Sequence, residues 1–253
     1  MNMRKKFLLV AISTFLCLLV LVLFIIRSST VTAPKTTTAS EPQTARTLPR
    51  DTTPDTFDSS LHSIDQPGSP WWIVNKNRPL PAGYIPGDLA VPNVSLRLTA
   101  SSEQMKLSAS IIPSVESFFG AADAAGVPLT FASGYRSEVY QTQLYNGYVA
   151  RDGQAAADRY SAKPGTSEHQ TGLAFDICVR GSACELTTDF ASTQAGKWVV
   201  EHAHEHGLII HYLQGKESFT GYDHEPWHLR FVGKELASEL KKNGQALEEF
   251  LLD

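Results

Sequence analysis

The apolar residues of this chain follow three successive patterns. Residues 7–26 form a run of 20 residues without a charge. Residues 28–66 are rich in Thr, Ser and Pro and nearly lack bulky apolar side chains, so they cannot bury enough surface to offset the entropy lost on ordering. From residue 67 onward, apolar positions recur with the periods of helices and strands. We therefore expect an N-terminal segment at 1–27, a disordered stalk at 28–66 and one folded domain at 67–253.

Within the folded domain, short strand patterns alternate with helical ones. Alternation of apolar and small or polar residues predicts strands at 127–133, 173–177 and 227–232, and a further strand is expected at 208–212. Three- and four-residue spacing predicts helices over 102–125, after Ser137, over 192–206 and at the C-terminus. Because these elements lack a regular βαβ rhythm, the sequence predicts the α+β class.

The pattern also makes predictions for the helix after Ser137 and for the residues that follow it. The helix after Ser137 is expected to bury Tyr140, Leu144 and Tyr148 on one stripe. Residues 153–164, which follow that helix, are expected to form a polar connection.

Residues 7–26 are long enough to cross a membrane. At about 1.5 Å of rise per residue, a helix of this length spans the roughly 30 Å of a hydrocarbon core. Arg4, Lys5 and Lys6 precede the run and only Arg27 follows it, which favours a cytoplasmic N-terminus. We expect a single-pass anchor in the cell membrane, with a cleaved signal peptide and a secreted protein as the alternative. In both cases the folded domain is extracytoplasmic.

Net charge and cysteine content bear on the possible binding partners and on disulfide formation. A net charge of −4 provides no basic surface for nucleic acid, and we expect a monomer. Cys178 and Cys184 flank a short loop that contains a glycine, and outside the cytoplasm such a pair is expected to form a disulfide. A metal site with two thiolates is the less favoured alternative, because no second cysteine pair completes it.

Two metal-ligating side chains lie in residues 165–176. His169 precedes Asp176 by seven residues, and Gly172 between them permits a sharp change of direction. In the strand pattern at 173–177, Asp176 lies on the face opposite the bulky apolar residues, which places the acid at the floor of a cleft. A histidine and an aspartate are two of the three protein ligands that a catalytic zinc site requires.

The candidate for the third ligand is His228, in the strand pattern at 227–232. His228 and Arg230 share the face opposite the apolar residues of that strand. Three protein ligands would leave the fourth zinc position open for water, whose pKa zinc lowers toward 7. Glu225, whose approach is fixed by Pro226, could take a proton from this water and pass it to a leaving amine.

Other interpretations of these residues remain open at this point. His169 alone suits a surface loop, His228 alone suits core packing, and Glu225 alone suits a solvated position. His202 and His206 lie one helical turn apart and could chelate a metal themselves. Glu205, however, is not placed for a His-Glu-x-x-His motif.

Three ordered motifs resemble the VanY-type D-alanyl-D-alanine carboxypeptidases. This family belongs to a wider group of zinc peptidases that includes LytM-like endopeptidases and the hedgehog signalling domain. The motifs are Ser133-Gly-Tyr-Arg-Ser137 with Gln141, Ser167-Glu-His-Gln-Thr-Gly-Leu-Ala-Phe-Asp176, and Gly221-Tyr222 followed by Glu225-Pro-Trp-His228. The resemblance spans about residues 70–235. It implies a small antiparallel sheet flanked by helices.

The resemblance also implies a role for each matching residue. His169, Asp176 and His228 would bind Zn²⁺, and Glu225 would be the general base. Arg136 would lie near the substrate carbonyl or carboxylate, where its guanidinium could also steady an oxyanion. The terminal carboxylate of the peptide would be bound in a pocket formed by Ser167, Gln141, Ser137, Tyr222 and Trp227.

The function implied is a zinc carboxypeptidase that removes the terminal D-alanine from peptidoglycan stem peptides, at a D,D or an L,D bond. One alternative is a zinc-containing wall-binding module without turnover, which would need neither Glu225 nor Arg136. Another is a peptidoglycan endopeptidase, which would not need a pocket for a free carboxylate. One departure from the family pattern is His211-Tyr212-Leu213, which stands where relatives often carry Arg-Tyr-Pro and affects the expected substrate preference.

Overall fold

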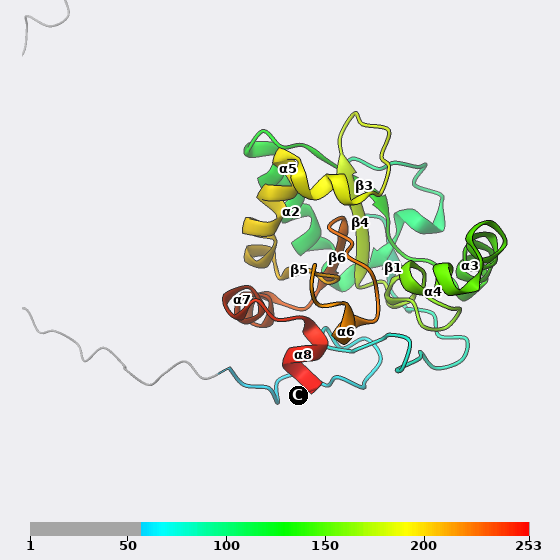
Figure 1. Cartoon of the computed structure of the whole chain (residues 1–253). Helices are drawn as coiled ribbons and strands as arrows, with labels where there is room; N and C mark the ends of the chain where they lie inside the picture. Colours follow the sequence, from blue (N-terminus) through cyan, green and yellow to red (C-terminus); the bar gives the residue numbers. More distant parts are fainter. Residues whose placement is uncertain (1–56, 253) are drawn as a thin grey trace, which may run out of the picture. The chain divides into compact units, whose positions relative to one another are not determined.

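The computed structural model describes residues 57–252 (Figure 1). The anchor predicted at 1–27 lies outside these residues and stays a prediction. Residues 57–66, which we assigned to the stalk, belong to the folded domain instead, because Phe57 stacks on Trp71 at 5.2 Å and Ile64 packs on the same cluster. None of the helices between residues 57 and 252 has the length and apolar character that crossing a membrane requires.

Four antiparallel strands form the central sheet, in the order β3-β4-β6-β5. These strands are β3 Leu129–Ser133, β4 Ala174–Val179, β5 Leu208–Ile210 and β6 His228–Phe231. In the centre of the sheet, Asp176 of β4 is paired directly with His228 of β6. A smaller sheet pairs β1 Leu89–Ala90 with β2 Leu107–Ser108. The expected α+β class with a small antiparallel sheet is confirmed.

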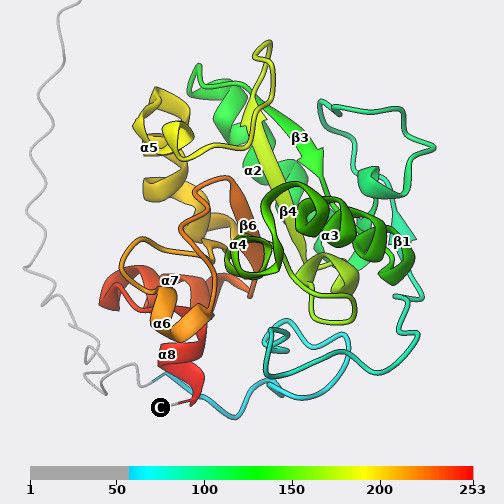
Figure 2. The same cartoon turned by 45° about the vertical axis from the view of Figure 1, so that its right-hand side comes forward.

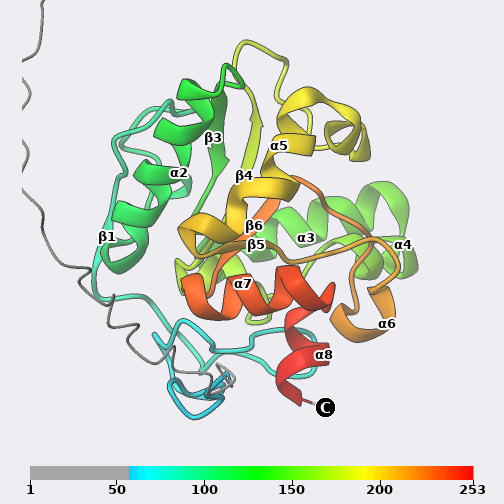
Figure 3. The ribbon, with the colours of Figure 1, turned by 90° about the vertical axis from the view of Figure 1, so that its left-hand side faces the viewer.

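Helices lie on both faces of the central sheet. Figure 3 shows α2 and α5 on one face and α3 and α4 behind the sheet, and Figure 2 brings α3 and α4 in front. The helices of residues 57–252 are α2 Ile112–Ala124, α3 Glu138–Asp152, α4 Gln154–Tyr160, α5 Gln194–His202, α6 Glu217–Thr220, α7 Lys234–Asn243 and α8 Leu247–Leu252.

The main core lies between the sheet and α2. Phe175 and Ile177 of β4 point to this side, together with Phe131 of β3 and Leu229 of β6. Phe131 stacks on Phe175 with ring centroids 5.5 Å apart. These apolar residues alternate with Asp176 and His228 along the strands. Packing of the apolar face against the core therefore places Asp176 and His228 on the opposite face of the sheet.

Three elements differ from the sequence prediction. The helix expected over 102–125 begins only at Ile112, because β2 pairs with β1 and Pro113 occupies the first turn of α2. Residues 153–164 contain the helix α4. Helix α3 buries Gln141 and Tyr145 rather than the expected stripe, because it packs on α4 and the residues after it. Tyr145 donates to Asp158 of α4, and Gln141 donates to the carbonyl of Ala162, which follows α4.

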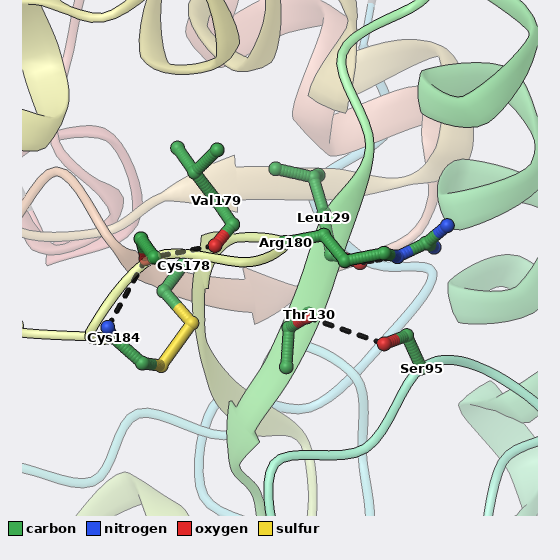
Figure 4. The surroundings of a disulfide bond; sticks show 8 residues. Ser95, Leu129, Thr130, Cys178, Val179, Arg180 and Cys184 are labelled. Carbon is green, nitrogen blue, oxygen red and sulfur yellow. Dashed lines mark hydrogen bonds between the residues drawn. A yellow bond between two sulfur atoms is a disulfide. The ribbon is translucent and has the colours of Figure 1, made fainter.

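Cys178 at the end of β4 forms a disulfide with Cys184 (Figure 4). The ring that it closes spans residues 178–184, where the hydroxyl of Ser182 donates to the Val179 carbonyl and accepts from the Cys184 amide. Next to it, Arg180 forms an ion pair with Asp123 of α2 at 3.0 Å. The disulfide therefore links the loop after β4 to Cys178, which lies two residues after Asp176 in the same strand.

Replacing both cysteines with serine should lower the free energy of unfolding by about 2 kcal/mol, because the unfolded chain regains the freedom of a short closed loop. Urea unfolding of the variant and the wild type measures the difference. The wild type treated with a reductant is the control and should lose a similar amount. An unchanged midpoint in both samples would contradict the prediction.

Candidate active site

Nearly all of the predicted site residues meet in one cleft of about 450 Å³. Its walls come from α3, β4, β6 and the loops before β4 and β6. The predicted residues that line it are Arg136, Gln141, Ser167, His169, Asp176, Tyr222, Glu225, Trp227 and His228. Only Ser137 of the predicted set is not among the lining residues.

A short turn before β4 places His169. Residues Glu168–Thr171 form a 3₁₀ helix that ends at Gly172, whose φ is +72°. A Cβ at Gly172 would lie 2.9 Å from the Ser108 amide nitrogen, so glycine is required both by the backbone angle and by the space. The Nδ1 atom of His169 lies 2.7 Å from the Gly134 carbonyl, which turns Nε2 toward Asp176.

His169, Asp176 and His228 form a buried group that can hold a metal ion. The Asp176 carboxylate lies between two imidazole nitrogens, with Oδ2 3.5 Å from His169 Nε2 and Oδ1 3.2 Å from His228 Nδ1. All three residues are at most 4% exposed. Ligand atoms about 2.0–2.2 Å from a tetrahedral zinc ion lie roughly 3.3–3.6 Å from one another, so these spacings fit zinc.

The protonation of the group also suits a cation. The Nε2 atom of His169 is buried and has no hydrogen-bond partner among residues 57–252. Burial, with the Arg136 guanidinium nearby, lowers the pKa of His169 to about 4, so its ring is neutral at pH 7 and keeps a lone pair. Burial alone would raise the pKa of Asp176, but both histidines and Arg136 hold it far below its usual range. Although burial opposes a charge on His228, hydrogen bonds to Asp176 and Glu168 and the negative charges of these two carboxylates raise its pKa, so the surroundings of this ring favour a positive charge.

Glu168, His211 and His228 form a second group of potential ligands. Its acceptor positions are already used, because Glu168 pairs with the Arg230 guanidinium through Oε1 and lies 2.7 Å from His211 Nδ1 through Oε2. Although burial opposes a charge on His211, Glu168 and Glu248 raise the pKa of His211 to about 10. A positively charged imidazole repels a metal, so the first group is the better cation site.

Glu225 and Arg136 lie in the same cleft as the metal group. Burial raises the pKa of Glu225 to about 7, close to the pH at which a proton can be both accepted and released. Arg136 Nη2 lies 3.8 Å from Asp176 Oδ2, and the buried Nε of Arg136 has no partner among residues 57–252. A carboxyl group with a pKa near neutral pH and a guanidinium N–H that can donate are therefore available to a substrate.

The predicted carboxylate pocket is formed in part. Gln141 is 1% exposed and its Oε1 has no partner among residues 57–252, as is also true of Tyr222 Oη. Ser167 and Trp227 line the same cleft. The structure does not support a substrate contact for Ser137, because its hydroxyl accepts from the Tyr140 amide as the cap of α3 and donates to Glu103.

The histidines of α5 and the turn after it do not form a metal group within residues 57–252. His202 Nδ1 contacts Glu205 at 3.1 Å, and His206 Nδ1 contacts Ser117 at 3.0 Å. Both side chains therefore have surface partners of their own.

Sequence reasoning missed the polar groups behind the metal site. Arg230 was expected in the cleft beside His228, but it is fully buried and donates to the Pro70 and Trp72 carbonyls. Tyr212, which belongs to the departure expected to affect substrate preference, lines the cleft and stacks on the His228 ring with centroids 4.6 Å apart. Only the position of Glu168 inside the His169 motif could have indicated that it contacts a ligand.

Comparison with known proteins gives consistent matches. The family model described as VanY, D-alanyl-D-alanine carboxypeptidase, matches residues 104–234. The putative carboxypeptidase YodJ of Bacillus subtilis is 39% identical over 75% of this chain and 70% of that protein. The solved structure of the LdcB LD-carboxypeptidase has a TM-score of 0.70 and 38% identity, covering 74% of this chain and 88% of its own. A Zn(II) complex of a mutant of the vancomycin-resistance D,D-pentapeptidase VanY has a TM-score of 0.60 and 34% identity, covering 71% of this chain and 97% of its own.

Proposed function

The chain belongs to the VanY family of D-alanyl-D-alanine carboxypeptidases, and from this membership we propose that it is a zinc-dependent carboxypeptidase acting on peptidoglycan. It removes the terminal D-alanine from stem peptides, at a D,D or an L,D bond. The observation that carries the proposal is the meeting of His169, Asp176 and His228 with Glu225 in a single cleft.

His169, Asp176 and His228 would hold the ion, each with one ligand atom. Zinc bound in this way supplies Lewis acidity, which makes water a nucleophile near neutral pH and polarises a carbonyl. The related VanY structure is a complex with Zn(II), which supports the choice of this metal over others.

Glu225 handles the proton. Its carboxylate lines the cleft, so it can accept a proton from the attacking water and deliver it to the amine that leaves. Arg136, whose Nη2 lies 3.8 Å from Asp176 Oδ2, can donate to the oxygen on which negative charge develops when water adds to the carbonyl. A module that only binds the wall would use neither group.

The carboxylate of the terminal residue is bound by polar groups beyond the metal. Ser167 and the Tyr222 hydroxyl can donate to its oxygens, and Gln141 Oε1 can accept from a substrate amide. Within residues 57–252, neither the Tyr222 hydroxyl nor Gln141 Oε1 has a hydrogen-bond partner. A pocket for a free C-terminus favours a carboxypeptidase over an endopeptidase that cleaves cross-links.

The enzyme acts outside the cytoplasm, attached to the cell membrane through residues 1–27. The Cys178–Cys184 disulfide supports this location, because such bonds persist in oxidising compartments. The substrate itself also lies there.

Incubation of the purified full-length chain with stem peptides tests the proposed function. Tetrapeptides that end in an L,D bond and pentapeptides that end in D-Ala-D-Ala should be offered separately, and released D-alanine measured. We expect release from at least one peptide, its loss after treatment with a chelator, and its return on addition of Zn²⁺. Equal release with and without chelator, or no release from either peptide, would refute the proposal.

A further inference from the structure

A chain of buried hydrogen bonds connects helix α8 to the metal ligand His228. Asn75 Nδ2 donates to Glu248 Oε1 at 3.1 Å, and Glu248 Oε2 lies 2.9 Å from His211 Nε2. His211 Nδ1 lies 2.7 Å from Glu168 Oε2, which in turn lies 3.1 Å from His228 Nε2. All five side chains are less than 9% exposed, so the path is shielded from bulk solvent.

The last contact determines which nitrogen of His228 faces the metal. Nδ1 lies beside Asp176 in the ligand group, so when Nδ1 binds the ion the remaining proton of the ring is on Nε2. Glu168 accepts this proton's hydrogen bond and thereby holds both the orientation and the basicity of the ring. Groups that orient a metal-binding histidine in this way commonly change metal affinity by 10–100-fold.

Glu168 cannot hold its position alone. Its Oε2 atom is shared by His211 and His228, while its Oε1 is bound by Arg230. His211 lies between two carboxylates, and an imidazole that donates from both nitrogens cannot turn without losing a bond. Glu248 therefore fixes His211, and His211 fixes the oxygen of Glu168 that faces His228.

We propose that Glu248 and His211 are positioning residues of the metal centre, which act on His228 through Glu168. Helix α8 is then part of the apparatus that holds the ion, although Glu248 lies beyond residues 104–234, the part of the chain that matches the family model. The inference rests on the metal site of the proposed function, but not on the identity of the substrate.

Zinc affinity of the full-length chain tests the inference directly. Metal-free wild type, Glu248→Gln and His211→Asn are titrated with Zn²⁺ in competition with a chromogenic chelator. The matched control is Glu249→Gln, since Glu249 is the next acid of α8 and pairs with Lys216 instead, 2.7 Å away. We expect the first two variants to bind zinc about 10-fold more weakly, at the lower end of the range for groups behind a ligand, and the control to stay within about twofold.

A spectroscopic measurement separates positioning from a purely structural role. In the ¹⁵N-labelled zinc-bound protein, the Nε2 proton of His228 should give a signal shifted downfield by the Glu168 hydrogen bond, and this shift should decrease in Glu248→Gln.

Two outcomes would overturn the inference. One is wild-type zinc affinity in a folded Glu248→Gln protein; if this variant does not fold, Glu248→Asp takes its place and is held to the same criterion. The other is a lower melting temperature of the metal-free protein without any change in zinc affinity or in the His228 signal. Zinc binding needs no substrate, so an absence of D-alanine release would refute the proposed function and leave this result standing.

Discussion

Replacing Glu225 with Gln should reduce kcat about 10³-fold while zinc remains bound. Glutamine has nearly the same shape but cannot accept a proton from water, and general acid–base catalysis typically contributes 10²–10⁴-fold. Such a loss corresponds to about 4 kcal/mol in the activation barrier. Initial rates of D-alanine release, together with the zinc content of the purified variant, provide the measurement.

Glu217→Gln is a suitable control for this experiment, because Glu217 is an exposed acid of α6 that does not line the cleft. It should retain the wild-type rate. A Glu225→Gln protein that contains zinc and turns over at the wild-type rate would remove Glu225 from the role of base.

Replacing His169 with Ala should abolish activity through loss of the metal. The imidazole supplies one of three protein ligands, and structural zinc sites with four ligands bind with roughly 10–16 kcal/mol. Loss of one ligand should therefore cost about 3 kcal/mol, on the order of a hundredfold in zinc affinity. Competition with a chelator measures this affinity, and far-UV circular dichroism verifies the fold.

His202→Ala is the matched control for the second variant. His202 lies at the end of α5, its ring nitrogen contacts a surface acid, and it was the rival ligand in the sequence. It should bind zinc as the wild type does. Wild-type affinity in His169→Ala, or a loss in His202→Ala, would show that the ion is held elsewhere.

The strands that carry the ligands could be predicted because their pattern is local. Phe175 and Ile177 of β4, with Leu173 directly before the strand, mark one face, so the position of Asp176 on the other face follows from two-residue periodicity. The same reasoning placed His228 opposite Leu229. The family motifs then added Arg136 and the residues of the carboxylate pocket, which periodicity alone could not have grouped.

The groups behind the ligands could not be predicted, since their partners are remote in the sequence. Arg230 contacts Glu168 and the carbonyl groups of Pro70 and Trp72, which are 62, 160 and 158 residues away. For the region around Glu248, the sequence pattern predicted only a helix at the C-terminus. Gly244 ends α7, however, and α8 turns Glu248 inward onto His211. A pattern read over a few turns contains no information about such contacts.

Direct pairing of Asp176 with His228 across neighbouring strands limits how this protein can vary in evolution. Inserting or deleting one residue within β4 or β6 would exchange the two faces of that strand, so a ligand would enter the apolar core and a core residue would enter the cleft. Length changes in homologous genes should therefore accumulate in the connections outside these two strands. Within β4 and β6, we expect only substitutions that preserve the alternation of apolar and polar residues.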